Sequence, residues 1–281
     1  MESAHTIREA RGALDAARCG GSVIGFVPTM GFLHAGHRSL IERSVAQTDF
    51  TVVSVFVNPL QFAPTEDFSS YPRDLVADVS VIRDAGADLV FVPSVAEMYP
   101  EPITSVVRVQ DVSSGLESIS RPTHFEGVST VVAKLFNIIG PCRAFFGEKD
   151  YQQLAIITRM AADLSFPVTV VGCPTVREPD GLAMSSRNAY LSGPEREAAT
   201  VLNRALVAGR SVIADGERSP TAVEATLAEV IDAEPLATRD YVAVRSADLA
   251  VIDEIAGPVR LLVAAEVGPA RLIDNCAAGI D

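Results

Sequence analysis

The sequence predicts an α/β protein with a doubly wound parallel sheet and a second, smaller α+β domain. Two observations predict this fold. Apolar runs of strand length, such as residues 23–27 and 50–57, alternate with stretches whose apolar spacing suits a helix. The alternation stops near residues 174–175, after which two Ala-rich helical stretches precede short apolar runs. We therefore expect a Rossmann-like domain over residues 1–175 and a smaller α+β domain over residues 176–281.

The expected elements follow this alternation in order. The first helix shows an apolar stripe at Ile7, Ala10, Leu14 and Ala17, and Gly86 is suited to end a later one. In the first domain we expect helices over residues 5–19, 38–45, 74–85, 128–139 and 151–164, and strands over 23–27, 50–57, 89–92, 106–109, 144–146 and 168–171. In the second we expect helices over about 194–214 and 219–233, and strands near 241–245, 260–265 and 270–274.

Composition narrows the functional class. The 281 residues are 48% hydrophobic and 21% charged, which is typical of a globular enzyme. A net charge of −13 opposes non-specific binding to nucleic acid, so an anionic substrate needs a local basic pocket. No apolar run is long enough to span a bilayer and the amino terminus does not resemble a signal peptide, so we expect a cytoplasmic protein. The four cysteines are far apart and predict neither a disulfide framework nor a zinc site.

The segment that joins the first buried strand to the next helix, residues 27–37, is the first candidate site. It lies at the carboxyl end of a strand, where open α/β sheets bind ligands. His34 and His37 are three positions apart and share a face of the first helical turn, where backbone N–H groups attract anions. This pair favours phosphate handling. Capping or surface histidines are the alternative, and a metal site lacks a further Cys or His nearby in the sequence.

Three other loops carry groups suited to a polar, anionic ligand. Lys149 lies at a strand-to-helix junction, and residues 180–188 offer two hydroxyls and a guanidinium to a phosphate. The amides Asn58, Gln61 and Gln153 suit a small ligand with hydroxyl and carboxylate groups. Taken alone, Lys149 is more simply a solvated surface lysine, and the amides are more simply ordinary loop or capping groups. Residues 180–188 could equally be a Ser-capped helix start. Neither a Gly-x-Ser-x-Gly nor a Walker-type motif occurs, so the chemistry would depend on positioning and charge stabilisation.

In combination these segments resemble a known family. His34-Ala35-Gly36-His37 is similar to the His-x-Gly-His signature of the nucleotidylyltransferase superfamily, and Met184-Ser185-Ser186-Arg187 to its phosphate loop. Together with residues 28–31, 56–62, 122–125 and 146–153 they resemble the pantoate–β-alanine ligase family. The resemblance is dense over about residues 23–191 and returns at 260–265 and 271–275.

The resemblance implies ATP-dependent ligation of pantoate and β-alanine to pantothenate through a pantoyl adenylate, with release of pyrophosphate and AMP. It implies catalytic roles for His37, His34 and Lys149. It implies pantoate binding by Gln61, Gln153 and Asn58, with Gln61 also facing β-alanine. The ATP-binding residues that it implies are Met30, Gly31, Phe32, Leu33, His34, Ala35, Gly36, His37, Gly147, Glu148, Lys149, Asp150, Val176, Met184, Ser185, Ser186 and Arg187.

It further implies a homodimer whose partners are small-molecule substrates, without nucleic acid or membrane, and whose smaller domain closes over the ATP site. Some relatives have paired acids where this chain has Ala77-Asp78, so Mg²⁺ is expected mainly on the ATP phosphates rather than on protein ligands. The late motif has Glu266 where a basic residue is expected. The alternatives are another small-substrate nucleotidylyltransferase and, from a different class, a non-catalytic nucleotide sensor of the same fold.

Overall fold

The computed structural model describes residues 1–63, 68 and 71–279. By the pattern of internal contacts the chain divides into two compact units. Unit 1 comprises Met1–Glu148 and Gln153–Pro174, and unit 2 comprises Lys149–Gln152 and Thr175–Asp281. In the part of the chain that is described, no helix is both long and apolar enough to cross a membrane.

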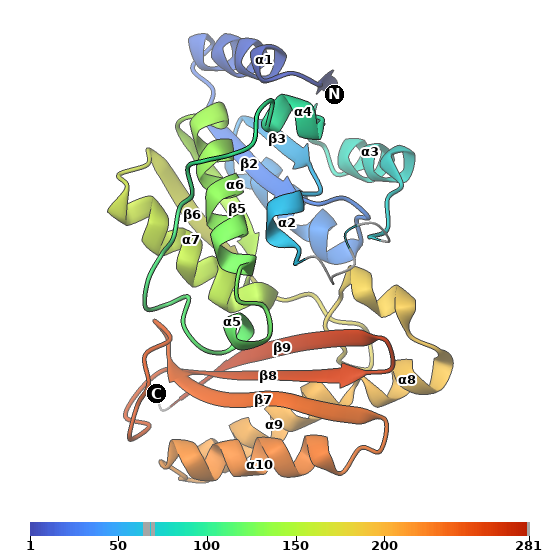
Figure 1. Cartoon of the computed structure of the whole chain (residues 1–281), viewed down its shortest axis with the longest axis vertical. Helices are drawn as coiled ribbons and strands as arrows, with labels where there is room; N and C mark the ends of the chain where they lie inside the picture. The colour runs from blue at the N-terminus through green and yellow to red at the C-terminus, as the bar shows by residue number, and fades with distance from the viewer. Residues whose placement is uncertain (64–67, 69–70, 280–281) are drawn as a thin grey trace. The chain divides into compact units, whose positions relative to one another are not determined.

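Unit 1 contains a six-stranded parallel sheet in the order β1-β4-β3-β2-β5-β6 (Figure 1). Its strands are β1 (Glu2–Ala4), β2 (Ile24–Thr29), β3 (Phe50–Val55), β4 (Leu89–Phe91), β5 (Cys142–Gly147) and β6 (Val168–Cys173). Its helices are α1 (Ile7–Cys19), α2 (Ala35–Gln47), α3 (Leu75–Asp84), α4 (Val95–Met98), α5 (Glu117–Ser120) and α6 (His124–Ile139), with the 3-10 turn η1 (Pro59–Gln61). Two further elements, η2 (Glu148–Asp150) and α7 (Tyr151–Asp163), belong partly to unit 2, which includes Lys149–Gln152.

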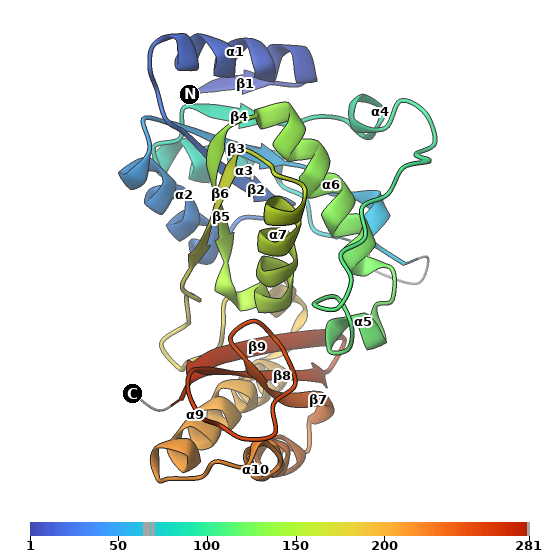
Figure 2. The same cartoon turned by 90° about the vertical axis from the view of Figure 1, so that its left-hand side faces the viewer.

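Helices cover both faces of this sheet, as the apolar strands require. Alternate residues of a strand point to opposite faces, so Phe26 packs into one core while Val27 packs into another. The first core includes buried residues of α1, α6 and α7, and the second includes residues of α2 and α3. Figure 2 shows α2 on one side of the strands and α6 and α7 on the other. The predicted doubly wound parallel sheet is confirmed.

Strand order reverses between β2 and β5. From β2 the chain continues through β3 to β4 on one side, whereas β5 leads to β6 on the other. At such a switch point, the crevice outside the carboxyl ends of the two strands is the usual ligand site of an open α/β sheet. The segment with His34 and His37 follows β2 directly, so it lies at the position where a ligand site is expected.

Unit 2 contains the antiparallel sheet β7 (Ala237–Ser246), β8 (Val259–Val267) and β9 (Ala270–Ala278). Buried side chains of α9 (Val201–Ala214) and α10 (Pro220–Asp232) pack against the sheet through residues such as Leu206, Leu227 and Leu261. Two short segments, η3 (Ser186–Tyr190) and α8 (Gly193–Ala198), precede α9. The predicted smaller α+β fold is thus also found.

Three local predictions were wrong, and one strand was not predicted. The strand expected over 106–109 is absent, because Val107 N–H donates to the Thr130 hydroxyl rather than to a neighbouring strand. Helix α6 begins at His124 and not at Val128. The helix expected over 194–214 is two helices, α8 and α9. Strand β1, the edge strand beside β4, was not predicted, because its three residues form no apolar run.

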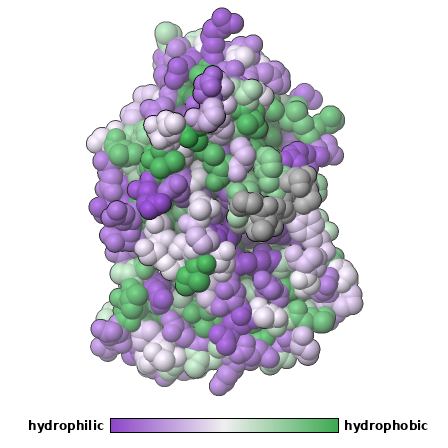
Figure 3. Space-filling view, viewed as in Figure 1, coloured by the Kyte–Doolittle hydropathy of each residue, from purple (hydrophilic) through white to green (hydrophobic). Residues whose placement is uncertain are grey.

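The surface is mixed. Large hydrophobic residues such as Val95, Ile119 and Val251 are exposed singly on different segments. On the face drawn in Figure 3, hydrophilic and hydrophobic residues are interspersed. A folded domain commonly has such a surface.

Candidate active site

The turn after β2 adopts a backbone conformation that other residues hold in place. Gly31 and Phe32 have φ values of 86° and 52°, in the left-handed region that non-glycine residues seldom adopt. The Asp78 carboxylate, buried on α3, accepts hydrogen bonds from Phe32 N–H at 2.9 Å and Leu33 N–H at 2.7 Å. A carboxylate that accepts two backbone N–H groups is a strong local anchor. The conformation of the turn therefore depends on α3 as well as on its own sequence.

His34 and His37 share the start of α2. His34 is the N-cap residue, and its Nδ1 accepts a hydrogen bond from Gly36 N–H at 3.1 Å. Nδ1 of His37 accepts one from His34 N–H at 3.3 Å, and the ring centroids are 4.1 Å apart. A nitrogen that accepts carries no hydrogen, so each neutral ring has its N–H at Nε2. The structure brings the two predicted histidines together as donors at a helix N-terminus, an arrangement that suits an anionic ligand.

The amides Asn58 and Gln61 form a buried cluster at the end of β3. Asn58 Nδ2 donates to Gln61 Oε1 at 3.3 Å, and Gln61 Nε2 lies 2.8 Å from the Met30 sulfur. Met30 belongs to the turn after β2, so the amide cluster and the histidine turn are linked within unit 1. Both amides are at most 7% exposed. These contacts support one polar site built from adjacent strand ends.

Further side chains hold this amide cluster in place. The Tyr99 hydroxyl donates to Asn58 Oδ1 at 2.9 Å, and burial raises the pKa of Tyr99, so the phenol remains a donor. Nδ1 of His124 lies 3.0 Å from the Gln61 carbonyl oxygen, and Arg121 Nη2 donates to the same oxygen at 3.3 Å. His124 thus contacts the backbone of a candidate site residue.

Gln153 and Gly147 are placed differently. Gln153 is half-buried on the first turn of α7, rather than on η1 with Gln61. Gly147 is the last residue of β5, the strand beside β2, and Glu148 follows it in η2. Both Gly147 and Gln153 belong to unit 1. Gln153 thus lies on the predicted helix, whereas Gly147, which was expected just after the strand 144–146, is the last residue of β5.

The remaining predicted phosphate residues lie in unit 2. Lys149 is in η2, with its side chain 18% exposed and its Nζ 3.9 Å from Asp150 Oδ1. Ser185 caps η3, with its hydroxyl accepting from Arg187 N–H at 3.3 Å. Lys149 and Ser185 line one small cavity of this unit, together with Asn188 and Asp274. Within unit 2, then, the structure brings two separately predicted phosphate residues together.

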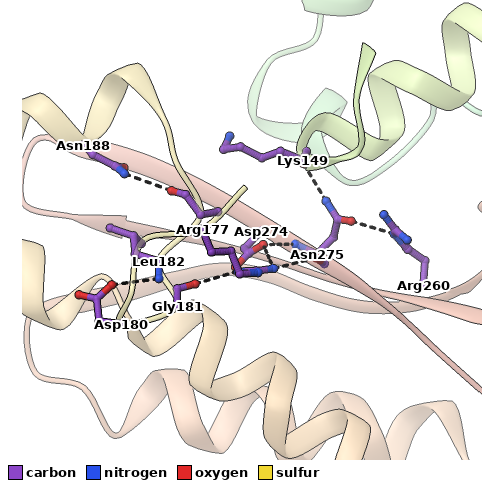
Figure 4. A network of polar contacts seen from close by, with 10 residues as sticks. Lys149, Arg177, Asp180, Gly181, Leu182, Asn188, Arg260, Asp274 and Asn275 are labelled. Carbon is purple, nitrogen blue, oxygen red and sulfur yellow. Dashed lines mark hydrogen bonds and ion pairs between the residues drawn. The ribbon is translucent and has the colours of Figure 1, made fainter. Parts of the chain in front are cut away.

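The segment before this loop is tied to β9. Met184 N–H donates to Val176 O at 3.0 Å, and the Arg177 guanidinium makes two hydrogen bonds to the Asp274 carboxylate, at 2.6 and 2.9 Å (Figure 4). Burial disfavours the charged guanidinium, but the hydrogen bonds and charge of Asp274 outweigh it and raise the pKa of Arg177. The ion pair therefore persists at neutral pH.

Sequence reasoning missed several supporting residues. The sequence raises Asp78 only in connection with a metal and Asp274 only within the resemblance at residues 271–275, and it indicates no role for Tyr99 or Arg177. Each supports the site through contacts with residues distant in sequence, so no local pattern indicated this role. Over the described ranges, no group of three His, Cys, Asp or Glu side chains is arranged to hold a metal ion.

Comparison with known proteins identifies the family. The family model described as Pantoate-beta-alanine ligase matches residues 2–277. A pantothenate synthetase of Agrobacterium fabrum is 50% identical over 277 residues, covering 98% of this chain and 95% of the relative. A pantothenate synthetase of Pelobacter propionicus is 53% identical over 261 residues, covering 92% of each chain.

Solved structures agree. The pantothenate synthetase of Thermus thermophilus superposes with a TM-score of 0.93 at 47% identity, covering 98% of this chain and 99% of that one. A pantoate-beta-alanine ligase of Francisella tularensis, solved in complex with beta-gamma ATP and beta-alanine, superposes with a TM-score of 0.82 at 31% identity over 98% of this chain and 97% of that one. With the parallel sheet and the histidine turn in place, these similarities show that the chain belongs to the pantoate–β-alanine ligase family.

Proposed function

We propose that this chain joins pantoate to β-alanine in an ATP-dependent reaction that forms pantothenate. The observation that carries the proposal is the histidine turn at the switch point of the sheet, in a chain that matches the family over residues 2–277. In the first step a pantoate carboxylate oxygen bonds to the α-phosphorus of ATP, and the bond from that phosphorus to the pyrophosphate oxygen breaks. In the second step the β-alanine amine bonds to the acyl carbon and loses a proton, and AMP leaves.

The ATP site comes from the histidine turn and the phosphate-binding segments. Residues 30–37 would face the nucleotide, with His34 and His37 donating from Nε2 to oxygens on which negative charge develops. Gly147, Glu148, Asp150 and Val176 would meet the remainder of the nucleotide, and Lys149, Met184, Ser185, Ser186 and Arg187 would hold its phosphates. Two of these, Lys149 and Ser185, line the same small cavity of unit 2, so they lie near one another in that unit. We propose residues 176–281 as the smaller domain that closes over ATP.

Pantoate would bind to Gln61, Gln153 and Asn58, and β-alanine to Gln61. Neutral amides can donate to a carboxylate and accept from a hydroxyl without adding charge to the site. The contacts of Asn58 with Gln61, and of Gln61 with Met30, support a pantoate position next to the ATP-binding turn. Mg²⁺ would be held mainly by the ATP phosphates, where it offsets phosphate charge. We also propose a cytoplasmic homodimer, by resemblance to the family.

The experiment that tests this function separates the two half-reactions. Purified protein is given ATP, Mg²⁺ and labelled pyrophosphate, with and without pantoate. We expect label to enter ATP only when pantoate is present, and addition of β-alanine to yield AMP and pantothenate in equal amounts. Exchange that needs no pantoate, or an adenylate that β-alanine does not discharge, would contradict the ligase assignment.

A variant assigns the pantoate site. Replacing Gln61 by Ala removes its hydrogen bonds, and a buried polar partner left unpaired costs about 1–3 kcal/mol, so we expect both half-reactions to slow by roughly ten- to a hundredfold. Unchanged rates in both would show that Gln61 does not bind pantoate.

A further inference from the structure

The segment 271–275, which carries part of the family resemblance, includes Asp274 and Asn275, and these two residues lie at the centre of a buried polar network in unit 2. Both residues are on β9 and less than 5% exposed. Burying polar side chains is costly unless they are hydrogen-bonded, so residues in such positions are held in one arrangement. Figure 4 shows that the network joins two segments far apart in sequence, one at Lys149 and one at residues 177–188.

Asn275 connects Lys149 with Arg260. Its Nδ2 donates to the Lys149 carbonyl oxygen at 2.7 Å, and its Oδ1 accepts from Arg260 Nε at 2.8 Å. Arg260 in turn stacks over the Tyr151 ring, 3.8 Å from its centroid. Figure 4 shows the Lys149 side chain extending away from the bonded carbonyl, which leaves its ammonium group outside this contact. Asn275 therefore fixes the backbone of Lys149 and not its charge.

Asp274 fixes the other segment. Its carboxylate accepts from both terminal nitrogens of Arg177 and also from Asn275 N–H, at 2.7 Å. Arg177 donates further to the Gly181 carbonyl oxygen at 2.9 Å, and its backbone bridges Ala183 directly before the Met184–Arg187 loop. One ion pair thus holds the stem of that loop.

We infer that Asp274 and Asn275 are positioning residues for ATP binding. The two residues hold Lys149 and the stem of the Met184–Arg187 loop at a fixed spacing from one another. The inference rests on the proposed function for the identity of the anion. Lys149 and Ser185 donate to phosphate oxygens only if their backbones are correctly spaced, and the two neighbouring residues of β9 set that spacing. Neither residue of β9 supplies a group to the reaction itself.

The test compares variants by calorimetric titration of ATP alone and pantoate alone. Asn275→Ala removes the side-chain hydrogen bonds to Lys149 and Arg260. Asn275→Asp keeps an acceptor for Arg260 but turns a carboxylate toward the Lys149 carbonyl oxygen. We expect the Kd for ATP to rise about tenfold in both, and the Kd for pantoate to stay within about twofold of wild type. We expect KM for ATP to rise in parallel and KM for pantoate to stay unchanged.

Asn137→Ala is the matched control, because its amide also donates to a backbone carbonyl, that of Ala133 in α6. We expect this variant to bind ATP and pantoate with wild-type affinity.

The possible outcomes distinguish a failure of the positioning role from a failure of the proposed ligase function. Unchanged ATP affinity in Asn275→Asp overturns the positioning role, as does an equal loss of pantoate and ATP affinity, which would indicate general damage. If Asn275→Ala fails to fold, Asn275→Asp decides by the same criteria. Wild-type protein that binds ATP but shows no pantoate-dependent exchange contradicts the ligase proposal, and the ATP titrations still test the positioning role.

Discussion

At the scale of single residues, Asp78 is the buried group on which the histidine turn most depends. Its carboxylate accepts the N–H groups of Phe32 and Leu33, and both residues lie just before His34. An added Cβ on Gly31 would lie 2.9 Å from Asp78 Oδ2, so the carboxylate also packs closely against the glycine. Glycine adopts the positive φ of Gly31 readily, but the positive φ of Phe32 persists only where its surroundings enforce it. Asp78 supplies that enforcement.

We predict that Asp78→Asn lowers both stability and turnover. The amide can accept only one of the two N–H groups and opposes the other with a donor, so the free energy of unfolding should fall by about 1–3 kcal/mol. The loosened turn should lower kcat at least tenfold, because misplaced donors stabilise developing charge poorly. Urea unfolding measures the change in stability, and the rate of pantoate-dependent pyrophosphate exchange into ATP measures the change in turnover.

Asp74→Ala is the control on the same helix. Asp74 is exposed and caps α3 by accepting from Ala77 N–H at 3.0 Å, so its loss should cost about 1 kcal/mol of stability. This hydrogen bond lies within the first turn of α3, so kcat should stay at the wild-type value. A kcat in Asp78→Asn equal to that of Asp74→Ala would contradict the role given to Asp78.

At the scale of elements, the close approach of α6 and η1 shapes the pantoate side of the site. A Cβ on Gly127 would lie 2.2 Å from the Leu60 carbonyl oxygen and 2.7 Å from Gln61 Cα, which are backbone atoms that cannot simply rotate away. The Gly127 carbonyl oxygen also accepts from Asn58 Nδ2 at 3.1 Å. Glycine at this position lets the helix support the amide cluster directly.

We predict that Gly127→Ala destabilises the protein and weakens pantoate binding. Alanine normally favours a helix by about 1 kcal/mol, but displacing backbone in a packed site costs about 1–3 kcal/mol, so the net change should be unfavourable. Gly12→Ala is the control, because nothing lies within 4 Å of an added Cβ there and α1 should become more stable. Pantoate titration and urea unfolding compare Gly127→Ala with Gly12→Ala. Equal stabilisation of the protein by both substitutions would show that α6 can move away from η1 to accommodate a side chain at position 127.

At the scale of the whole molecule, the sequence predicted the order of elements well for strands that are buried on both faces of the sheet. Strands such as β3 are nearly continuous apolar runs because helices cover both faces of the sheet, and such runs are visible in sequence. Strand β1 has only Ala4 buried and pairs at the edge, so no run indicated it. The start of α6 was placed too late because Gly127 favours a loop locally, whereas tertiary packing against η1 explains it.

The residues of the candidate site also fall into two groups, those that local sequence could predict and those that only the fold brings together. His34 and His37 are close in sequence and could be predicted together, since helix geometry alone gives them one face. Asp78, Tyr99 and Asn275 act through partners 41 to 126 residues away, and only the folded chain brings those groups within hydrogen-bond distance. Local motifs thus indicate candidate reactive groups, whereas only the folded chain shows which residues hold them in place.

The buried thiols give a prediction for the whole molecule at alkaline pH. All four cysteines are free, and burial raises the pKa of Cys142 to about 12 and those of Cys173 and Cys276 to about 11, above the ordinary 9.0. Between about pH 9 and 11 the unfolded chain releases protons that the native protein retains. The free energy of unfolding therefore falls as pH rises through this range, and these thiols contribute no such change below it.

For one fully buried thiol the fall is about 1.4 kcal/mol per pH unit above 9. We expect urea unfolding under reducing conditions to show stability declining from pH 9 to 11. The decline should be shallower in Cys142→Ala, since that side chain no longer titrates in the unfolded chain. Cys19→Ala is the control, because Cys19 is exposed and its removal should leave the slope as in wild type. Parallel pH profiles for wild type and Cys142→Ala would show that the Cys142 thiol ionises in the native protein as readily as in the unfolded chain.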